Sequence, residues 1–508
     1  MMDDDHGPEM KGRARRAGEA RARGPGSQVT GTASQAVVGR LRRDLGTLES
    51  YAALLGILIG AGIFTVTSRA WTLTGPSVIL GYLILLPVIL ATSVPYAAFL
   101  STPLGREPGG EYTHISRTLG GYRIAFVGTW LKIISYIGAL AFLVNALADY
   151  MIQFAGGRLQ PATYRLPLAL GSLLFFYLVH VVGVRWFGRL QVTMCALLGL
   201  SLIVLVVPGL FAIRPTNYQP FLAHGLSGLA ASLVLLFFSY AGFESLAQTA
   251  GEVEGSTEKL PKVFLKGITI TAVIFVLMSV VAFGVLPGPR LQTSNAPMAE
   301  VAAVYLPAGA ALFVTFGAIM ALTTSINSTM LVPSRLGIIL ARDRLAPRWI
   351  GAINARTATP INGLTLTLGA AALLLVSSQV SLALNIAVFA LVVLYFLHSL
   401  TFLLLERRNP KLYSLIKISL KPSFQRATAW LSVLAMGGII AIQVVQDVQT
   451  LATQSLSQRL AGHSLTSLEL ALAWGLIGAM LYAYGRSRRP DTDSKIVLES
   501  EIRQDRHV

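Results

Sequence analysis

Two short stretches decide how this chain folds: IGAGIF at residues 59–64 and SYAGFE at residues 239–244. Each places glycine near the middle of a long apolar segment, where it weakens a helix by about 1 kcal/mol relative to alanine. In a bilayer, an interrupted helix survives only where protein or a water-filled cavity satisfies its backbone N–H and C=O groups. Two such interruptions, five spans apart, predict a ligand site near the middle of the membrane.

The composition of the 508-residue chain is that of a helical membrane protein. Hydrophobic residues make up 54% and charged residues 13%, whereas a soluble domain carries roughly 25% charge. The apolar stretches run continuously for about 20 residues, which is the length a helix needs to cross the hydrocarbon core and which excludes the alternating segments of a β-barrel. We therefore predict an all-α polytopic fold.

Twelve apolar segments are long enough to be spans. They fall at residues 51–70, 77–100, 122–155, 166–184, 190–213, 227–250, 264–286, 306–340, 361–378, 382–405, 427–446 and 467–485. The third and eighth are longer than a perpendicular crossing requires, so we expect them to tilt or to extend beyond the membrane.

Lysine and arginine set the predicted orientation. With a cytoplasmic N-terminus, 34 of the 41 basic residues lie on the cytoplasmic side and six on the other, and Lys132 lies inside span 3. This asymmetry follows the positive-inside rule, so we expect both termini in the cytoplasm and a multi-pass location in the cytoplasmic membrane. The same rule explains the net charge of +17 without a nucleic-acid partner. Residues 1–45 lack the apolar core of a secretory signal and are expected to form a disordered tail.

The loop after span 8 concentrates this basic charge. It holds one acid, Asp343, among five arginines: Arg335, Arg342, Arg344, Arg348 and Arg356. Membrane lipid is an expected partner of the chain, and binding of anionic headgroups is an alternative explanation of this loop. The positive-inside rule accounts for it without that function.

The two interruptions suit the two ends of a zwitterion. Free N–H groups near Gly60 to Gly62, with the dipole of the half-helix that follows, would attract a carboxylate. Carbonyl groups freed near Ala241 and Gly242 could accept hydrogen bonds from an ammonium group. The alternative for span 1 is that its glycines allow close helix packing, and span 1 alone does not decide between the two. A weak echo, Ala-Gly at 61–62 and at 241–242, fits two structural repeats.

Several motifs resemble those of the amino acid–polyamine–organocation (APC) superfamily of permeases. They stand in the family's order, as GAGIF at 60–64, GGEY at 109–112, residues 238–244 with Glu252 and Leu260-Pro261, and Asn327-Ser328 with Ser334-Arg335 and Ala341-Arg342-Asp343. The resemblance implies a leucine-transporter-type 5+5 inverted repeat with two extra C-terminal helices. It also implies a domain order of a tail (1–45), a first repeat (46–213), a second repeat (227–405), the two extra helices (427–485) and a C-terminal tail (486–508).

The resemblance also implies a function, namely alternating-access transport of amino acids by symport or antiport. Carried over by position, the backbone of Gly60, Ala61, Gly62 and Ile63 would hold the substrate carboxylate. Phe238, Ser239 and Ala241 would meet the amino group, with Phe238 as an aromatic gate. The alternatives are a polyamine or organic-cation permease and a membrane sensor of the same fold that does not transport.

Glu244 and Lys132 are the candidates for coupling, because charged groups are costly inside a membrane. Glu244 would bind the coupling proton, or else serve as a structural carboxylic acid. Lys132 would replace a coupling cation, although we favour an ammonium that reaches the cytoplasmic interface. Some relatives carry a lysine on the fifth span, where this chain has Leu198.

Hydroxyl groups on span 8 leave sodium open as the coupling ion. Thr324, Ser325 and Ser328 could help to bind Na⁺, or could simply form interhelical hydrogen bonds. We prefer protons to sodium.

Other residues carry less of the prediction. Tyr136 and Asn145 are expected to pack rather than to face substrate, and Asp149 is expected at the outer interface. The chain has no P-loop, HExxH or Ser/His/Asp pattern, so we expect neither catalysis, nor direct use of ATP, nor a cofactor or metal. The single cysteine, Cys195, cannot form an intrachain disulfide.

Overall fold

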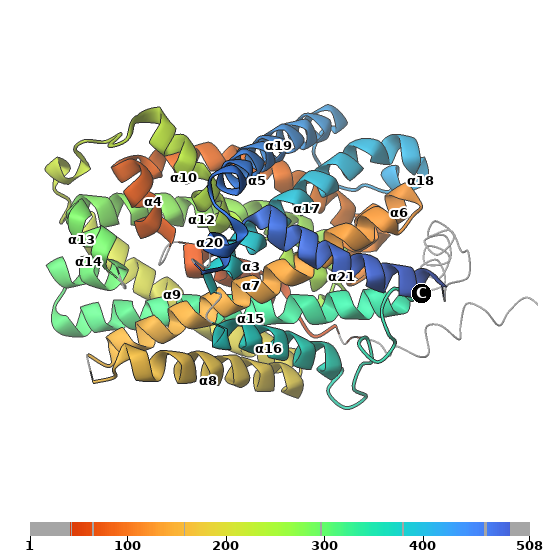
Figure 1. Cartoon of the computed structure of the whole chain (residues 1–508), viewed down its shortest axis with the longest axis horizontal. Coiled ribbons are helices and arrows are strands. Elements are labelled where there is room, and N and C mark those ends of the chain that lie inside the picture. The colour runs from red at the N-terminus through yellow and green to blue at the C-terminus, as the bar shows by residue number, and fades with distance from the viewer. Residues whose placement is uncertain are drawn as a thin grey trace, which may run out of the picture.

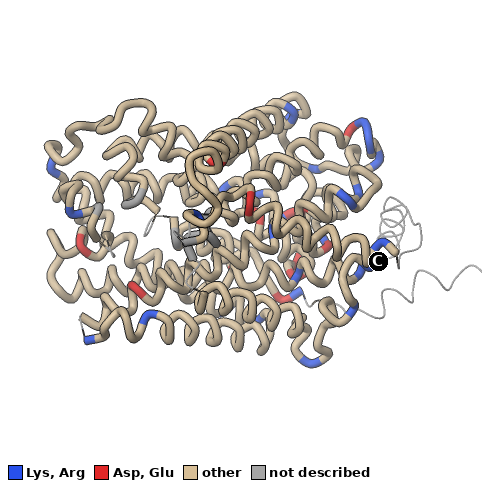
Figure 2. Tube along the Cα trace, in the orientation of Figure 1, with Lys and Arg blue, Asp and Glu red and all other residues tan. Residues whose placement is uncertain are grey.

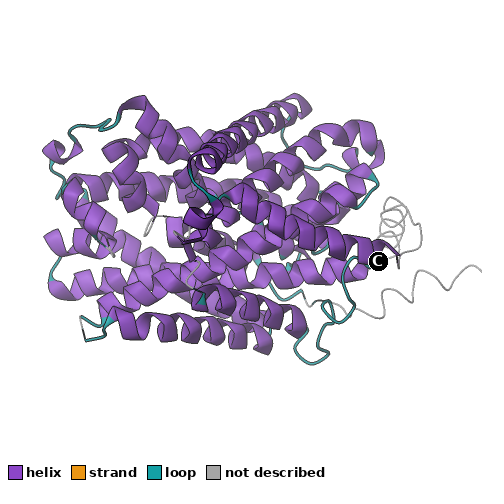
Figure 3. Cartoon of the chain, in the orientation of Figure 1, coloured by secondary structure: helices purple, strands orange, loops and turns teal. Residues whose placement is uncertain are grey.

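A bundle of long helices forms the protein (Figure 1). The structure, a computed structural model, describes residues 41–487 except 42, 63–65, 157, 295–296, 378–379 and 462–464. Within these residues every regular element is a helix (Figure 3), and one isolated β-bridge joins Leu45 to Val253. The predicted all-α class is therefore confirmed.

Each of the twelve predicted segments coincides with helix. In chain order the helices are α3 (Thr47–Ala61) with α4 (Thr67–Thr74), α5 (Val78–Leu100), α7 (Arg123–Phe154), α8 (Pro161–Val182), α9 (Val184–Gly209), α10 (Gly225–Tyr240) with α11 (Ser245–Gln248), α12 (Ser256–Val285), α15 (Ala308–Arg342), α16 (Ile361–Val376), α17 (Val380–Arg408), α19 (Pro422–Thr453) and α21 (Ser467–Ser487). In the described part of the chain, ten helical stretches are long and apolar enough to cross a membrane, and Thr47–Gly60 and Ile361–Val376 are shorter apolar helices.

Short helices in the loops were not predicted. They are α6 (Glu111–Leu119), α13 (Gly288–Thr293), α14 (Pro297–Tyr305), α18 (Pro410–Tyr413) and α20 (Leu456–Ala461). A hydropathy pattern finds spans, and these helices are too short or too polar to be spans. In Figure 1, α6 lies at one end of the bundle, and α13 and α14 lie at the other.

The sixth span is interrupted where its sequence predicts. Helix α10 ends at Tyr240, Ala241 is extended with ψ of 147°, and Gly242 takes φ of +106°. This left-handed region favours glycine because it carries no Cβ. The short helix α11 then begins at Ser245. In the first span, α3 and α4 are separate helices, but Gly62 and Val66 on either side of the gap keep right-handed helical backbone angles. Residues 63–65 between them lie outside the described part, so the interruption of this span stays a prediction.

Helix α3 lies in the centre of the bundle, packed against α9, α12 and α15. Its glycines permit this approach, because a Cβ on Gly60 would lie 2.6 Å from the carbonyl oxygen of Ala321 on α15. The close-packing explanation of these glycines therefore holds for Gly60. The long helices α7 (32 residues) and α15 (35 residues) pack against each other and complete the centre.

Lysine and arginine gather toward one end of the bundle. Figure 2 shows them around α6, α18 and the last turn of α21, with few at the opposite end. We call the first of these the basic end. It is the end on which the sequence analysis places the cytoplasm.

Gly60 provides a test of the packing between α3 and α15. We expect Gly60→Ala to destabilise the protein by about 1–3 kcal/mol, since the added methyl group meets backbone as well as side chain. Gly199→Ala on α9 is the matched control, because a Cβ there has nothing within 4 Å. Thermal unfolding in detergent would measure both, and a Gly60→Ala variant as stable as the control would contradict this packing.

Candidate functional site

The first span and the interrupted sixth span face a common cavity inside the bundle. The cavity encloses about 40 Å³ and is built from α3, α7, the region between α10 and α11, α15 and α17. Its lining residues are Ile57, Leu58, Gly62, Ser135, Tyr136, Ala139, Leu143, Phe238, Ser239, Ala241, Gly242, Thr329 and Leu391. Segments 180 residues apart in sequence thus meet at one small space.

Hydrogen bonds join the end of α3 to the interruption of the sixth span. The hydroxyl of Ser239, near the end of α10, donates to the carbonyl of Gly62 at 3.3 Å. Tyr82 on α5 lies 3.2 Å from the Ser239 hydroxyl and 2.9 Å from that of Thr67 on α4. Buried polar groups require such partners, so this string of hydroxyls fixes how α4, α5 and α10 meet beside the cavity.

Four of the predicted substrate residues line the cavity: Gly62, Phe238, Ser239 and Ala241. Gly60 is not among the lining residues and packs instead against α15. Ala61 is the last residue of α3, and Ile63 lies outside the described residues. The predicted site is therefore brought together on the α10 side and only partly described on the α3 side.

The lining is mostly apolar and carries no charge among the described residues. Its hydroxyls are largely engaged elsewhere, since Ser135 donates to the carbonyl of Ala387 at 2.8 Å and Ser239 to Gly62. The ring of Phe238 packs edge-on against Phe142, with 6.0 Å between centroids. A ligand in this cavity would meet methyl groups, an aromatic ring and backbone rather than a salt-bridge partner.

Glu244 lies next to the cavity, fully buried. It accepts hydrogen bonds from the hydroxyl of Tyr136 at 2.6 Å, from the backbone N–H of Gly242 at 3.0 Å and from the hydroxyl of Tyr395. Tyr136 and Gly242 also line the cavity. Tyr136 packs in the buried core, as expected. It also lines the cavity, so two residues connect the cavity directly to the carboxylate.

Lys132 does not reach an interface, and our preference for that position was wrong. Its side chain is only 1% exposed, and Nζ lies 2.9 Å from both carboxylate oxygens of Glu111. An oxygen of a second carboxylate, Oε1 of Glu244, lies 3.8 Å from Nζ. A buried ammonium requires such partners, because its desolvation otherwise costs several kcal/mol.

Glu111 is the functional candidate that sequence reasoning missed. It begins α6, and it accepts hydrogen bonds from Tyr96 and from Gln248 of α11, each at 2.8 Å. Burial raises the pKa of the Glu111 carboxyl, while Lys132 opposes the shift. We call Glu111, Lys132 and Glu244 the charge cluster.

One signal in the sequence pointed to Glu111: this acid directly follows a pair of glycines, Gly109 and Gly110, in the loop after the second span. The φ of Gly110 is +45°, and a Cβ on it would overlap the side chain of Gln248. This glycine therefore lets the loop approach α11, which a linear sequence does not reveal. A lysine inside a span also demands an acid somewhere, but does not say which one.

The three hydroxyls predicted on span 8 all point to carbonyl groups of α3. Ser325 donates to Gly56 at 2.8 Å, Thr324 lies 3.1 Å from the same oxygen, and Ser328 lies 3.4 Å from the carbonyl oxygen of Ala53. The interhelical hydrogen bonds that were the alternative to sodium binding are therefore present.

The fifth span approaches α3 through an amide and not through a cation. Gln191 on α9 donates to the carbonyls of Ala52 at 3.1 Å and Thr324 at 3.2 Å, and Leu198 on the same helix is buried among apolar side chains.

At the outer end of α7, Asp149 pairs with Arg165 at 2.6 Å with both side chains partly exposed, as expected for an interface.

Two buried ion pairs tie helices together toward the basic end. Arg335 on α15 lies 2.7 Å from Glu252, which follows α11, and Arg117 on α6 lies 3.3 Å from Asp343. All four side chains are at most 6% exposed. These pairs join α15 to the segment after α11, and α6 to the residue that follows α15.

A bundle of apolar helices with an interrupted helix beside a central cavity is an arrangement typical of membrane transporters. The model of the amino acid permease family matches residues 45–458, and the chain belongs to this family. The predicted membership of the APC superfamily is thereby confirmed.

Characterised relatives differ in what they carry. The chain is 24% identical to a branched-chain amino acid permease of Bacillus subtilis, over 63% of this chain and 71% of the relative. It is 25% identical to a methylthioribose transporter of the same organism, over 64% and 73%. It is also 25% identical to cationic amino acid transporter 1 of Arabidopsis thaliana, over 63% of this chain and 55% of the relative.

The charge cluster provides a double-mutant test. We expect Lys132→Met to cost about 3–5 kcal/mol, because it leaves two carboxylates facing each other without a cation. Glu111→Gln should cost less, since Glu244 remains near the ammonium, and the double variant should cost much less than the sum of the two. Unfolding in mixed micelles would measure the three variants, and strictly additive losses would show that these groups do not interact.

Proposed function

We propose that the protein is a secondary active transporter that moves amino acids across the cytoplasmic membrane by alternating access. Residues 46–213 and 227–405 would form two inverted five-helix repeats, followed by two extra helices. The loop helices support this proposal, because α6 follows the second span helix at one end of the bundle and α13 and α14 follow the seventh at the other (Figure 1). The basic end would face the cytoplasm together with both termini.

The substrate we propose is an amino acid with a neutral side chain. Its carboxylate would bind the backbone at residues 60–63, and its amino group would meet Phe238, Ser239 and Ala241 at the end of α10. The uncharged lining of the cavity supports this choice. A second positive charge on the substrate would find no partner there, and its desolvation would oppose binding. The same lining disfavours polyamines.

One observation carries the proposal of proton coupling: Tyr136 and Gly242 both line the cavity and both donate hydrogen bonds to Glu244. A substrate that reorients either residue removes a donor from the carboxylate. Reorientation of either residue would therefore change the hydrogen bonding of the group that we propose as the proton site. Substrate binding and proton binding would therefore be linked through two shared residues.

The position of Lys132 supports assigning the proton to Glu244. Its ammonium lies 2.9 Å from Glu111 and 3.8 Å from Glu244, so the stronger Coulomb interaction is with Glu111. With both acids ionised the cluster carries one net negative charge, which one proton would neutralise. We assign that proton to Glu244, while Lys132 and Glu111 remain paired as ions.

Protons are favoured over sodium by the state of the α15 hydroxyls. Thr324, Ser325 and Ser328 already donate to α3 carbonyls, so a sodium ion would have to displace these bonds.

The buried pairs Arg335–Glu252 and Arg117–Asp343 would open to release substrate toward the cytoplasm. Both symport and antiport remain compatible with this geometry.

Glu244→Gln tests the assignment of the proton. In proteoliposomes preloaded with amino acid, we expect the variant to exchange labelled leucine at a rate similar to the wild type. An imposed inward proton gradient should accelerate net uptake by the wild type and not by the variant, because the amide cannot bind a proton. Glu258→Gln, an exposed acid of α12, is the isosteric control. A variant that keeps its response to the gradient would exclude Glu244 as the proton site.

The lining predicts selectivity. We expect unlabelled leucine, valine and alanine to compete with labelled leucine uptake, and arginine, lysine and spermidine to compete at least 100-fold less well, as an unpaired charge in an uncharged cavity requires. Competition in the same proteoliposomes measures this ratio. Equal competition by arginine would overturn the neutral-substrate proposal, and binding of leucine without accumulation or exchange would indicate a sensor instead.

A further inference from the structure

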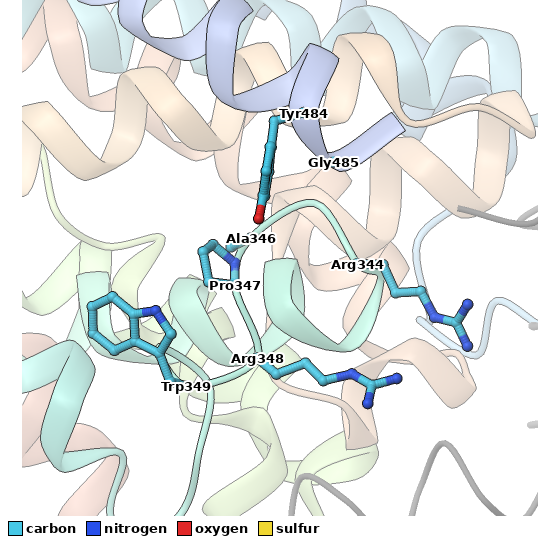
Figure 4. Close-up of a pocket in the computed structure, with 7 residues that line it drawn as sticks. All are labelled: Arg344, Ala346, Pro347, Arg348, Trp349, Tyr484 and Gly485. Carbon is cyan, nitrogen blue, oxygen red and sulfur yellow. The ribbon is translucent and has the colours of Figure 1, made fainter. Parts of the chain in front are cut away.

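A second pocket lies at the basic end of the bundle (Figure 4) and shares no lining residue with the central cavity. It encloses about 560 Å³ between the loop after α15 and the last turn of α21. Its lining residues are Arg344, Ala346, Pro347, Arg348, Trp349, Tyr484 and Gly485. Nothing in the transport proposal uses it.

The two arginines of this pocket are not neutralised by the described part of the protein. The acid next to them in sequence, Asp343, is 8% exposed and turns inward, where it accepts a hydrogen bond from Tyr112 at 2.7 Å and pairs with Arg117. No described carboxylate lies within 4 Å of Arg344 or Arg348. Their side chains extend to the same side of the loop (Figure 4), so two positive charges face one space.

The walls of the pocket are held in place by close packing. A Cβ on Gly485 of α21 would lie 2.9 Å from the Cα of Leu345 and 3.0 Å from the carbonyl oxygen of Arg344. Arg344 itself takes φ of +59°, which is uncommon for a residue with a Cβ and persists only where the surroundings enforce it. The loop is thus fixed against α21 in a conformation that presents the arginines.

The position of the pocket is that of a membrane interface. It lies just beyond Arg342, the last residue of α15, and beside the last turn of α21, which ends at Ser487. Trp349 and Tyr484 on its walls are 53% and 46% exposed, and their amphipathic rings are typical of residues at headgroup level. A ligand here would be reached from the lipid leaflet as well as from water.

We propose that this pocket binds the headgroup phosphate of an anionic phospholipid from the leaflet at the basic end. Arginine suits this ligand because its planar guanidinium donates paired hydrogen bonds to phosphate oxygens. Basic pockets between membrane helices on the cytoplasmic side recognise such headgroups. Trp349 and Tyr484 would contact the glycerol and upper acyl region, which a soluble phosphate lacks.

Native mass spectrometry of the full-length protein tests this proposal. After equilibration in mixed phosphatidylcholine and phosphatidylglycerol, we expect retained phosphatidylglycerol and no comparable retention of phosphatidylcholine. Arg344→Ala with Arg348→Ala should weaken phosphatidylglycerol retention by about 30-fold, as expected for two interfacial arginines. Excess glycerol 3-phosphate should not displace the lipid.

The matched control removes the same charge outside the pocket, through Arg356→Ala with Lys266→Ala, two exposed basic residues that do not line it. This control should retain the lipid. Equal loss in both double variants would show that only overall surface charge matters, and no loss in the pocket variant would exclude the site. Displacement by glycerol 3-phosphate would assign the pocket to a soluble ligand. Leucine exchange by each variant confirms that it is folded.

Discussion

The ammonium of Lys132 imposes the strongest constraint on this bundle. Lipid cannot solvate it, so protein must supply its counter-charge at hydrogen-bonding distance. Glu111 does so from a loop helix, and Glu244 lies on its other side at the interruption of the sixth span. Helices α6, α7 and α11 are thereby tied to one point, and the tyrosines that complete the hydrogen bonding come from α5, α7 and α17.

This arrangement separates proton binding from substrate binding, which a single buried acid beside the substrate would combine. A free carboxylate beside an amino acid site would pair with the substrate ammonium and would favour cationic substrates. Here both acids already have donors: Lys132 holds Glu111, and two tyrosines and a backbone N–H hold Glu244. The described residues that line the cavity carry no charge. The charge cluster therefore can respond to substrate through Tyr136 and Gly242 without forming part of its binding surface.

The sequence predicted the fold well, because each span carries its own signal. Twelve apolar segments became twelve helical regions, and the glycines at 241–242 marked a real helix end. The sequence predicted less well which charged residues of the site pair with one another. We predicted that Lys132 lies at an interface because a hydropathy pattern shows how far along its own span a residue lies. It does not show which side chains of other helices surround that residue. Glu111 was recognised as part of a motif, yet its contact with Lys132 depends on how a loop helix folds back against α7 and α11.

The structure of the protein in lipid nanodiscs with leucine bound tests the account most directly. We predict that the leucine carboxylate lies within hydrogen-bonding distance of the backbone at residues 60–63, that the amino group lies at the end of α10 beside Ser239 and Ala241, and that Lys132 remains paired with Glu111. A leucine ammonium bound directly to Glu244 or Glu111, or a leucine bound away from the cavity between α3 and α10, would contradict the account.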